Sequence, residues 1–251
     1  MGPVFLLSLR QLTGRWRLFL ILFLALLPIA LAGLVSATLS EDESSNEDFI
    51  NTLLDTLLIA GILPIIIMVL ATASFGNELE DRTLSFLVLK PLRRELIVLP
   101  KLLAAVVVGG PLLIVSGVAA TLLGASSFGA VLLVVDGGGQ AALAVGVAVL
   151  AGVVSYAAIF TWAGLMSTRA LAFALVYVFL WEGLVSTFLG GVRYLSVRGY
   201  TLGILHGMDD TSFGSLGDRV IEFPAALVGA AVTTIAFFLL TVRRLRRMDI
   251  P

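Results

Sequence analysis

Few side chains in this sequence could perform chemistry, and the first candidates surround its single histidine. His206 is followed closely by Asp209 and Asp210, and one imidazole with two carboxylates could make a weak metal site. A closed zinc site needs four ligands with nitrogen or sulfur among them, and the chain has no cysteine to supply a thiolate. We therefore expect that the chain holds no metal.

Motifs for catalysis are missing from the sequence as well. It has no His-Glu-x-x-His pair, no Gly-x-Ser-x-Gly elbow and no Gly-x-x-x-x-Gly-Lys-Ser/Thr loop. The triple glycine at 137–139 does not lead into a phosphate-binding fingerprint. We expect no catalytic residue, no cofactor bound by this chain and no hydrolysis of nucleotide by the chain itself. An intramembrane enzyme is accordingly disfavoured.

One carboxylate lies where carboxylates are rare. Glu182, in the run YVFLWEGLVS, is the one acidic residue deep in an apolar stretch that is long enough to cross a membrane. Such a carboxyl must be protonated, paired or in contact with a wet cavity. Two interpretations stay open: Glu182 makes a polar contact in a translocation path, or it makes a structural hydrogen bond or ion pair, with Arg193 as a possible partner.

The densest group of charges lies between two long apolar runs, in NELEDRTLSFLVLKPLRRELIVLPK from Asn77 to Lys101. Five basic and four acidic residues fall in this stretch. A chain that is otherwise so apolar is expected to carry a highly charged internal loop only where it contacts something in water. We therefore predict that a soluble partner binds here.

The elements that position these residues are predicted to be membrane-spanning helices. Apolar residues make up 59% of the chain and charged residues 13%, with a mean hydropathy of +1.07. Because about 20 apolar residues cross the hydrocarbon core as a helix, the sequence predicts one all-α membrane domain with six transmembrane helices. Their expected ranges are 18–39, 50–75, 96–124, 140–166, 170–190 and 223–242.

Basic residues predict the orientation of these helices. If the N-terminus is cytoplasmic, thirteen of the sixteen Lys and Arg residues fall on the cytoplasmic side. The positive-inside rule then favours a multi-pass protein of the cell membrane with both termini in the cytoplasm. The acidic loop Glu41–Asp48 and the segment 191–222 would lie outside. In the fourth predicted helix, small residues recur at Ala144, Ala148 and Gly152, which is typical of close packing within a bundle or at a subunit interface.

The charged stretch predicts a short helix of its own. Thr83 can cap a helix that extends to Lys90, and Leu84, Leu87 and Val88 then form one apolar face. Pro91 ends this helix, because a residue before proline is pushed toward extended geometry. The alternative is a helix that rests on lipid headgroups.

This stretch resembles the signature that follows the second span of type-2 ABC exporter permeases. In ABC transporter permeases of that family, the segment that carries this signature is known as the coupling helix. Departures from the family pattern are Arg82 in place of Gly, Ser85 in place of Glu and Pro100 in place of Gly before Lys101. An amphipathic N-terminal segment, Val4–Arg17, and the pair Trp181-Glu182 extend the resemblance. The residues of this chain that occupy the signature, with Arg82 at the departing position, are Glu78, Glu80, Asp81, Arg82, Thr83, Leu84, Leu87, Lys90, Pro91, Arg94, Lys101 and Leu102.

The resemblance implies a function and a set of partners. A separate ABC ATPase subunit, which binds ATP and Mg, would dock on the coupling helix within the segment 77–95 and drive export. A second permease chain, identical or related, would complete the path in the lipid membrane, and nucleic acid would not be a partner. The segment 191–222 would carry short re-entrant helices. The alternative is a membrane anchor or assembly subunit without transport.

Overall fold

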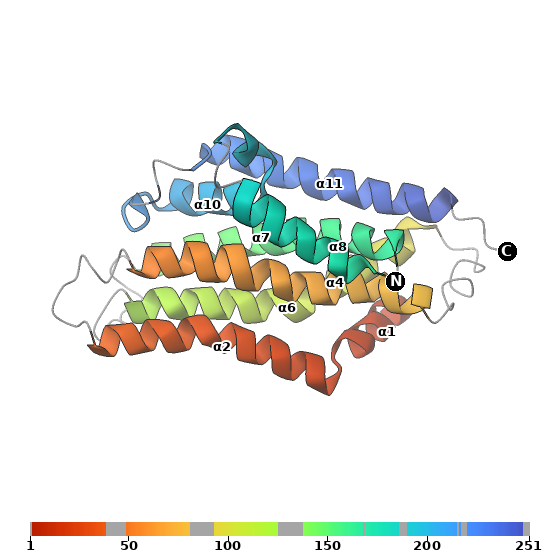
Figure 1. The fold of residues 1–251 in the computed structure, drawn as a ribbon, viewed down its shortest axis with the longest axis horizontal. Coiled ribbons are helices and arrows are strands. Elements are labelled where there is room, and N and C mark those ends of the chain that lie inside the picture. Colours follow the sequence, from red (N-terminus) through yellow and green to blue (C-terminus); the bar gives the residue numbers. More distant parts are fainter. Residues whose placement is uncertain are drawn as a thin grey trace.

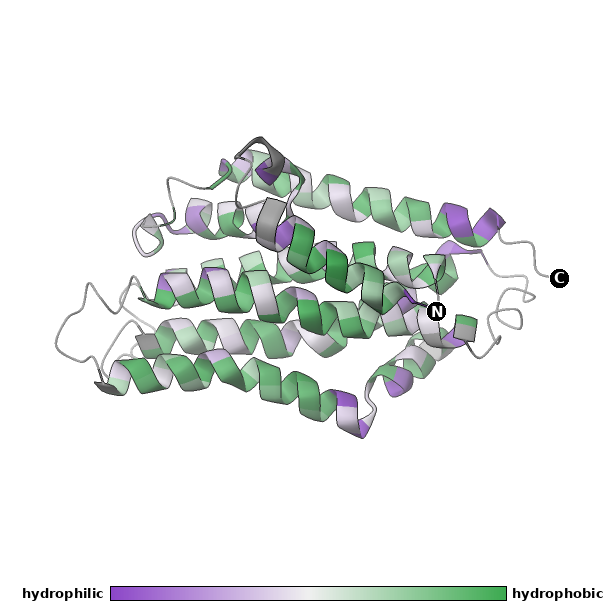
Figure 2. Cartoon of the chain, viewed as in Figure 1, coloured by the Kyte–Doolittle hydropathy of each residue, from purple (hydrophilic) through white to green (hydrophobic). Residues whose placement is uncertain are grey.

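The computed structural model of the chain describes residues 2–38, 49–80, 93–124, 138–167, 169–185, 190–214, 216 and 220–247. Within these residues the chain is helical and contains no β-strand, which confirms the predicted all-α class. The helices run side by side as a bundle (Figure 1). Hydrophobic residues fill most of their length, whereas hydrophilic residues gather toward the ends of the bundle (Figure 2).

Three kinds of helix occur among the described residues. The α-helices are α1 (Gly2–Leu12), α2 (Arg15–Thr38), α4 (Leu63–Glu80), α6 (Glu95–Gly124), α7 (Gly138–Met166), α8 (Ala170–Val176), α10 (Val197–Met208) and α11 (Phe223–Arg247). Two π-helical segments, η1 (Leu53–Ile62) and η3 (Tyr177–Val185), continue directly into or out of α-helices, and η4 (Gly190–Leu195) is a 3-10 helix. α1 and the C-terminal end of α11 lie at one end of the bundle, here called the termini end (Figure 1). The opposite end is called the far end.

Five of the six predicted spans coincide with long apolar helices. Within the described residues, five helices are long and apolar enough to cross a membrane by length and composition. Their bounds agree with the predicted ones to within a few residues, except at the C-terminus of the last helix. They cover Arg15–Ala37, Phe49–Gly76, Glu95–Leu123, Gly139–Met166 and Phe223–Arg247.

The fifth predicted span, 170–190, differs. Its described part is the shorter apolar helix Ala170–Gly183, formed by α8 and most of η3, and residues 186–189 lie outside the described residues. The predicted amphipathic N-terminal segment, Val4–Arg17, is divided between two helices. α1 ends at Leu12, and α2 begins at Arg15 after a break at Thr13 and Gly14.

α7 lies at the centre of the packing and contacts α4, α6, α10 and α11. The small-residue stripe on this helix is buried within the chain: Ala144 and Ala148 are both 0% exposed. A Cβ atom on Gly152 would lie 2.8 Å from Thr201 Oγ1 of α10, so the absence of a side chain lets α10 approach. Of the two interpretations of the stripe, bundle packing is therefore the one that the structure supports.

α10 is packed closely on its other side as well, against α11. A Cβ on Gly203 would lie 2.6 Å from Ile221 O, and one on Gly229 would lie 2.4 Å from Tyr200 Cε1. Both distances are shorter than van der Waals contact, so only glycine fits at these positions without a shift of the neighbours. α10 lies beside α11 in the far half of the bundle (Figure 1).

Candidate functional sites at the two ends of the bundle

The whole of the predicted docking helix Thr83–Lys90 lies outside the described residues, which include neither Asp81 nor the range Arg82–Leu92 with Thr83, Leu84, Leu87, Lys90 and Pro91. The structure describes the residues on both sides of this predicted helix. α4 continues to Glu80 and α6 begins at Glu95, so the described helices reach into both ends of the predicted segment 77–95. Arg94 lies at the start of α6, where its carbonyl accepts the backbone N–H of Val98 at 3.1 Å. Both flanking helix ends lie toward the termini end (Figure 1).

A buried ion pair joins these two helix ends. Lys101 Nζ of α6 lies 2.6 Å from Glu78 Oε1 of α4, and the two side chains are 1% and 9% exposed. The ammonium group also donates a hydrogen bond to the Ser74 carbonyl oxygen and lies 4.3 Å from the centroid of the Phe75 ring. The sequence predicts Glu78 in the coupling segment 77–95 and Lys101 near the start of the helix 96–124, but it does not indicate that the two side chains pair. The pair holds together the two helices that flank the undescribed segment.

A second ion pair at the termini end is exposed. Arg246 near the end of α11 contacts Glu95 at the start of α6, with side chains 61% and 40% exposed. Exposed pairs of this kind contribute only about 0–1 kcal/mol. The pair is informative about position, because it shows that α11 ends beside the start of α6.

In the far half, Glu182 is fully buried, with an exposed fraction of 0%. Its carboxylate accepts hydrogen bonds from the Tyr177 hydroxyl at 3.1 Å and the Ser196 hydroxyl at 2.5 Å. It also accepts the backbone N–H groups of Val197 at 3.0 Å and Arg198 at 3.4 Å, which belong to the first turn of α10. The free N–H groups of a helix N-terminus favour a negative charge at this position.

The interpretation of Glu182 as a structural contact to the outer segment is thus supported by its bonds. The interpretation as part of a translocation path stays a prediction. The contact between Glu182 and α10 could not be predicted from the spacing of residues in the sequence, because it depends on how α10 packs against α7 and α11.

A second carboxylate meets the same turn of α10. Arg198 donates from Nε to Asp55 Oδ1 at 2.8 Å and from Nη2 to Asp55 Oδ2 at 2.8 Å. This bidentate geometry matches the planar guanidinium to the planar carboxylate. The two residues lie 143 positions apart in sequence, and their side chains are 18% and 20% exposed. The position of Asp55 within the second predicted span, 50–75, gives no indication of this partner.

The predicted metal candidates at the far end have structural partners instead. His206 Nδ1 lies 3.1 Å from the Phe213 carbonyl oxygen. Asp209 Oδ1 accepts the Thr211 hydroxyl at 2.6 Å and the Ser212 backbone N–H at 3.1 Å, which closes a turn after α10. Burial raises the pKa of Asp209, and these hydrogen bonds outweigh burial, so the pKa lies below its ordinary value of 3.8. Among the described residues, no three metal-ligating side chains gather into one group.

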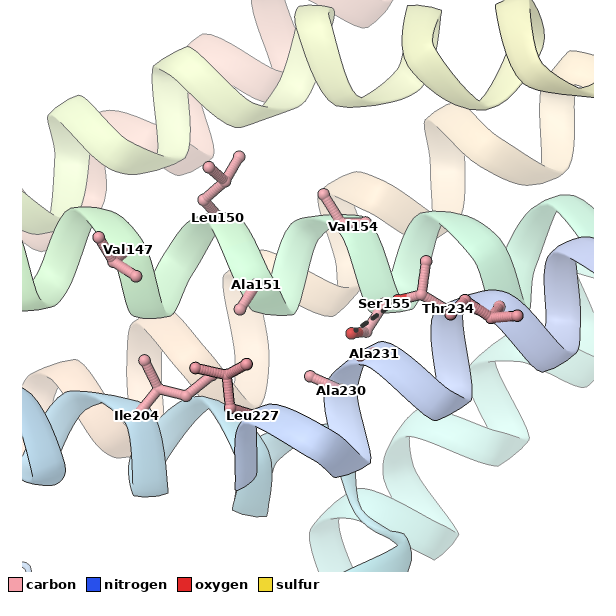
Figure 3. A pocket seen from close by; sticks show the side chains of 11 residues that line it. Val147, Leu150, Ala151, Val154, Ser155, Ile204, Leu227, Ala230, Ala231 and Thr234 are labelled. Atoms are coloured by element: carbon pink, nitrogen blue, oxygen red, sulfur yellow. Dashed lines mark hydrogen bonds between the residues drawn. The ribbon is translucent and has the colours of Figure 1, made fainter. Parts of the chain in front are cut away.

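An apolar groove of about 370 Å³ opens between α7 and α11 (Figure 3). Valine, leucine and alanine side chains line most of it, and Ile204 of α10 lies at one end. Two hydroxyls in the groove, Ser155 Oγ and Thr234 Oγ1, lie 3.3 Å apart and hydrogen-bond to each other. Because the two hydroxyls satisfy one another, the groove presents a nearly apolar surface.

Two comparisons with known proteins bear on these sites. The family model described as ABC-2 family transporter protein matches residues 13–181, which is more than half of the chain. The match includes the undescribed charged segment, the Glu78–Lys101 pair and Asp55, and it ends one residue before Glu182. No curated protein matches the sequence.

Proposed function

Because the chain belongs to the ABC-2 transporter family, we propose that it is the membrane permease of an ATP-driven exporter. In this proposal a separate ABC ATPase subunit docks on the helix Thr83–Lys90. The chain itself contributes no catalytic residue, and ATP and Mg²⁺ bind to the partner. The family match is the observation that carries the proposal, and the all-helical bundle with five long apolar helices agrees with it.

The proposed topology has six spans and two cytoplasmic termini. The helix Ala170–Gly183, lengthened by the residues that follow it, supplies the fifth span. The termini end holds Arg243, Arg244, Arg246 and Arg247 at the end of α11, together with α1 (Figure 2). A cluster of arginines favours the cytoplasmic side of the cell membrane. The exposed Leu6, Leu7 and Trp16 of the N-terminal region suit the boundary between lipid and water.

Coupling to the ATPase follows from the arrangement of the flanking helices. A force on the segment 81–92 acts on both α4 and α6, because the chain enters the segment from one and leaves it into the other. The buried pair between Glu78 and Lys101 ties these helices together, so they would respond as one unit. α7, packed against both, would pass the displacement to the rest of the bundle. A second permease chain, identical or related, would complete the translocation path.

The substrate that suits this bundle is amphipathic or lipid-like. The polar positions within its spans are few, and the groove between α7 and α11 is lined mostly by aliphatic side chains. Stimulation of ATP hydrolysis in the complex by amphiphiles would support this class. Stimulation by polar solutes alone would exclude it.

Co-purification tests the proposal. The chain is purified in mild detergent and the proteins that elute with it are identified by mass spectrometry, for wild type and for Leu84→Asp combined with Leu87→Asp. We expect an ATPase with nucleotide-binding motifs to elute with wild type and to be lost from the double variant. Ser212→Asp, at an exposed position at the far end of the bundle, is the control and should retain the ATPase.

Two results would contradict the proposal. An intact double variant that still binds the ATPase would show that this helix is not the docking element. A wild-type protein that elutes with partners but with no ATPase would favour an anchor or assembly subunit.

A further inference from the structure

We propose that Asp55 and Glu182 form a two-point latch on α10, in which the Asp55–Arg198 pair opens during transport while the Glu182 contact persists. The opening step rests on the proposed transport function. The latch itself does not, and it can be tested on the isolated chain.

Two carboxylates from different helices converge on the first turn of α10. Glu182 binds the backbone N–H groups of Val197 and Arg198, and Asp55 binds the Arg198 side chain through two 2.8 Å hydrogen bonds. One residue, Arg198, is therefore held by its backbone on one side and by its guanidinium on the other. The position of α10 in the bundle is defined by both contacts together.

Both carboxylates lie in π-helical segments. Asp55 belongs to η1 and Glu182 to η3, and these are the two π-helical segments among the described residues. π-Helical turns are rare and occur frequently at functional sites, because the wider turn changes the direction of the side chains that it carries. In this chain, each π-helical segment carries one acidic residue, and both acidic residues contact the same helix.

The two contacts differ in how easily they can open. Glu182 is 0% exposed, and separation from α10 would take the backbone N–H groups of Val197 and Arg198 away from this buried carboxylate. The side chains of Asp55 and Arg198 are 20% and 18% exposed, so this pair is less completely enclosed by the protein than Glu182. We therefore assign the permanent attachment to Glu182 and the reversible one to Asp55.

Thr201 reports on the opening of α10. It lies one helical turn after Val197, is 0% exposed and faces Gly152 of α7, so it becomes accessible only when α10 moves away from α7. The chain contains no cysteine, which makes Thr201→Cys a single reactive thiol. Cysteine is also close to threonine in size, so the substitution keeps the packing.

The experiment measures how fast a hydrophilic maleimide labels Thr201→Cys in the full-length chain in mild detergent. Asp55→Asn should raise this rate about tenfold, which corresponds to about 1.4 kcal/mol. Asp55→Glu keeps the charge and should leave the rate near that of the parent. Asp210→Asn removes an exposed carboxylate shortly after the end of α10 and is the matched control. The labelling rate should not change in this variant.

Ser116→Cys separates local opening from general loss of structure. Ser116 is 0% exposed on α6, away from α10. If Asp55→Asn raises the labelling rate of Thr201→Cys but not that of Ser116→Cys, the result supports the latch. An unchanged rate at Thr201→Cys, or an equal rise at both positions, overturns it.

A second arm tests opening during transport, with the co-purified ATPase present. ATP should raise the labelling rate of Thr201→Cys when Asp55 is intact and should add little when Asp55→Asn has already opened the pair. If ATP is hydrolysed but the rate does not change, the opening step is wrong and the latch is a static contact. Absence of any co-purified ATPase would instead contradict the proposed function and leave the first arm valid.

Discussion

Substitution of Lys101 by methionine gives the sharpest test of the buried ion pair at the termini end. Methionine keeps an unbranched side chain of similar length and removes the charge. Glu78, whose side chain is only 9% exposed, then loses the ammonium group that lies 2.6 Å from its Oε1. Its other oxygen, Oε2, is buried and makes no hydrogen bond to any described residue. The variant therefore leaves a carboxylate that neither water nor a cation stabilises.

The expected loss of stability in Lys101→Met follows from the loss of the ammonium partner of Glu78. Removal of one partner from a buried ion pair destabilises a protein by about 3–5 kcal/mol, because the remaining charge stays desolvated. Loss of the contact to the Phe75 ring adds about 1 kcal/mol or less. For a chain of this size, a loss of 3–5 kcal/mol corresponds to a thermal midpoint lower by about 6–20 °C.

The assay is thermal unfolding in mild detergent, followed by tryptophan fluorescence. The control is the double variant Glu78→Leu with Lys101→Met, which removes both charges. Its midpoint should return close to that of wild type, since apolar replacement of a buried pair is often neutral or stabilising. The reasoning is refuted if Lys101→Met alone unfolds within about 2 °C of wild type, or if the double variant is no more stable than the single one.

Three further outcomes follow from the packing and from the titratable groups. Gly229→Ala should destabilise the chain by about 1–3 kcal/mol, because the new Cβ would lie 2.4 Å from the Tyr200 ring; Gly76→Ala, where nothing lies within 4 Å of the new Cβ, should be neutral or slightly stabilising in the same unfolding assay. The pKa of Asp209 is lowered in the folded chain, so its contribution to stability is complete above its ordinary value of 3.8 and is lost as the pH falls through the lower folded value. Unfolding curves of wild type and Asp209→Asn should accordingly differ at neutral pH and converge in strong acid, and a constant difference would contradict this assignment. Thr234→Val should cost less than about 1 kcal/mol, since a single hydroxyl pair within a membrane bundle averages about 0.6 kcal/mol; a larger loss would show that the groove hydroxyls carry more of the helix packing than their 3.3 Å contact implies.

The long apolar helices were predictable from hydropathy because each is a continuous run without a competing signal. The second predicted span, 50–75, became a described span of Phe49–Gly76, with Asp55 as its one charged residue. The interior of this span was not predictable, because a period of 3.6 residues carries no mark of a π-helical turn. The change of helix type at Leu63 and Pro64 coincides with a proline whose ring removes a backbone donor.

The polar contacts were predictable only in part. Glu182 was conspicuous because a carboxylate is rare in a span, yet its partners come from the backbone of α10, which carries no residue-type signal. The pairing of Asp55 with Arg198 joins positions 143 residues apart, and nothing local to either residue indicates the other. Lys101 lies within the predicted helix 96–124, and α6 begins at Glu95, but nothing in the sequence indicates that this side chain is buried against Glu78.

A cross-linking measurement tests the central claim, that an ATPase docks on the segment 81–92 at the termini end. Because the chain has no cysteine, Ser85→Cys introduces one thiol within the predicted docking helix, and Ser212→Cys introduces one at the far end, where the residue is exposed. A short cross-linker that joins thiols to amines is applied to each purified complex. The account predicts that Ser85→Cys cross-links to an ATPase subunit and that Ser212→Cys does not. A cross-link at Ser212→Cys only, or none at Ser85→Cys in a complex that contains the ATPase, would contradict it.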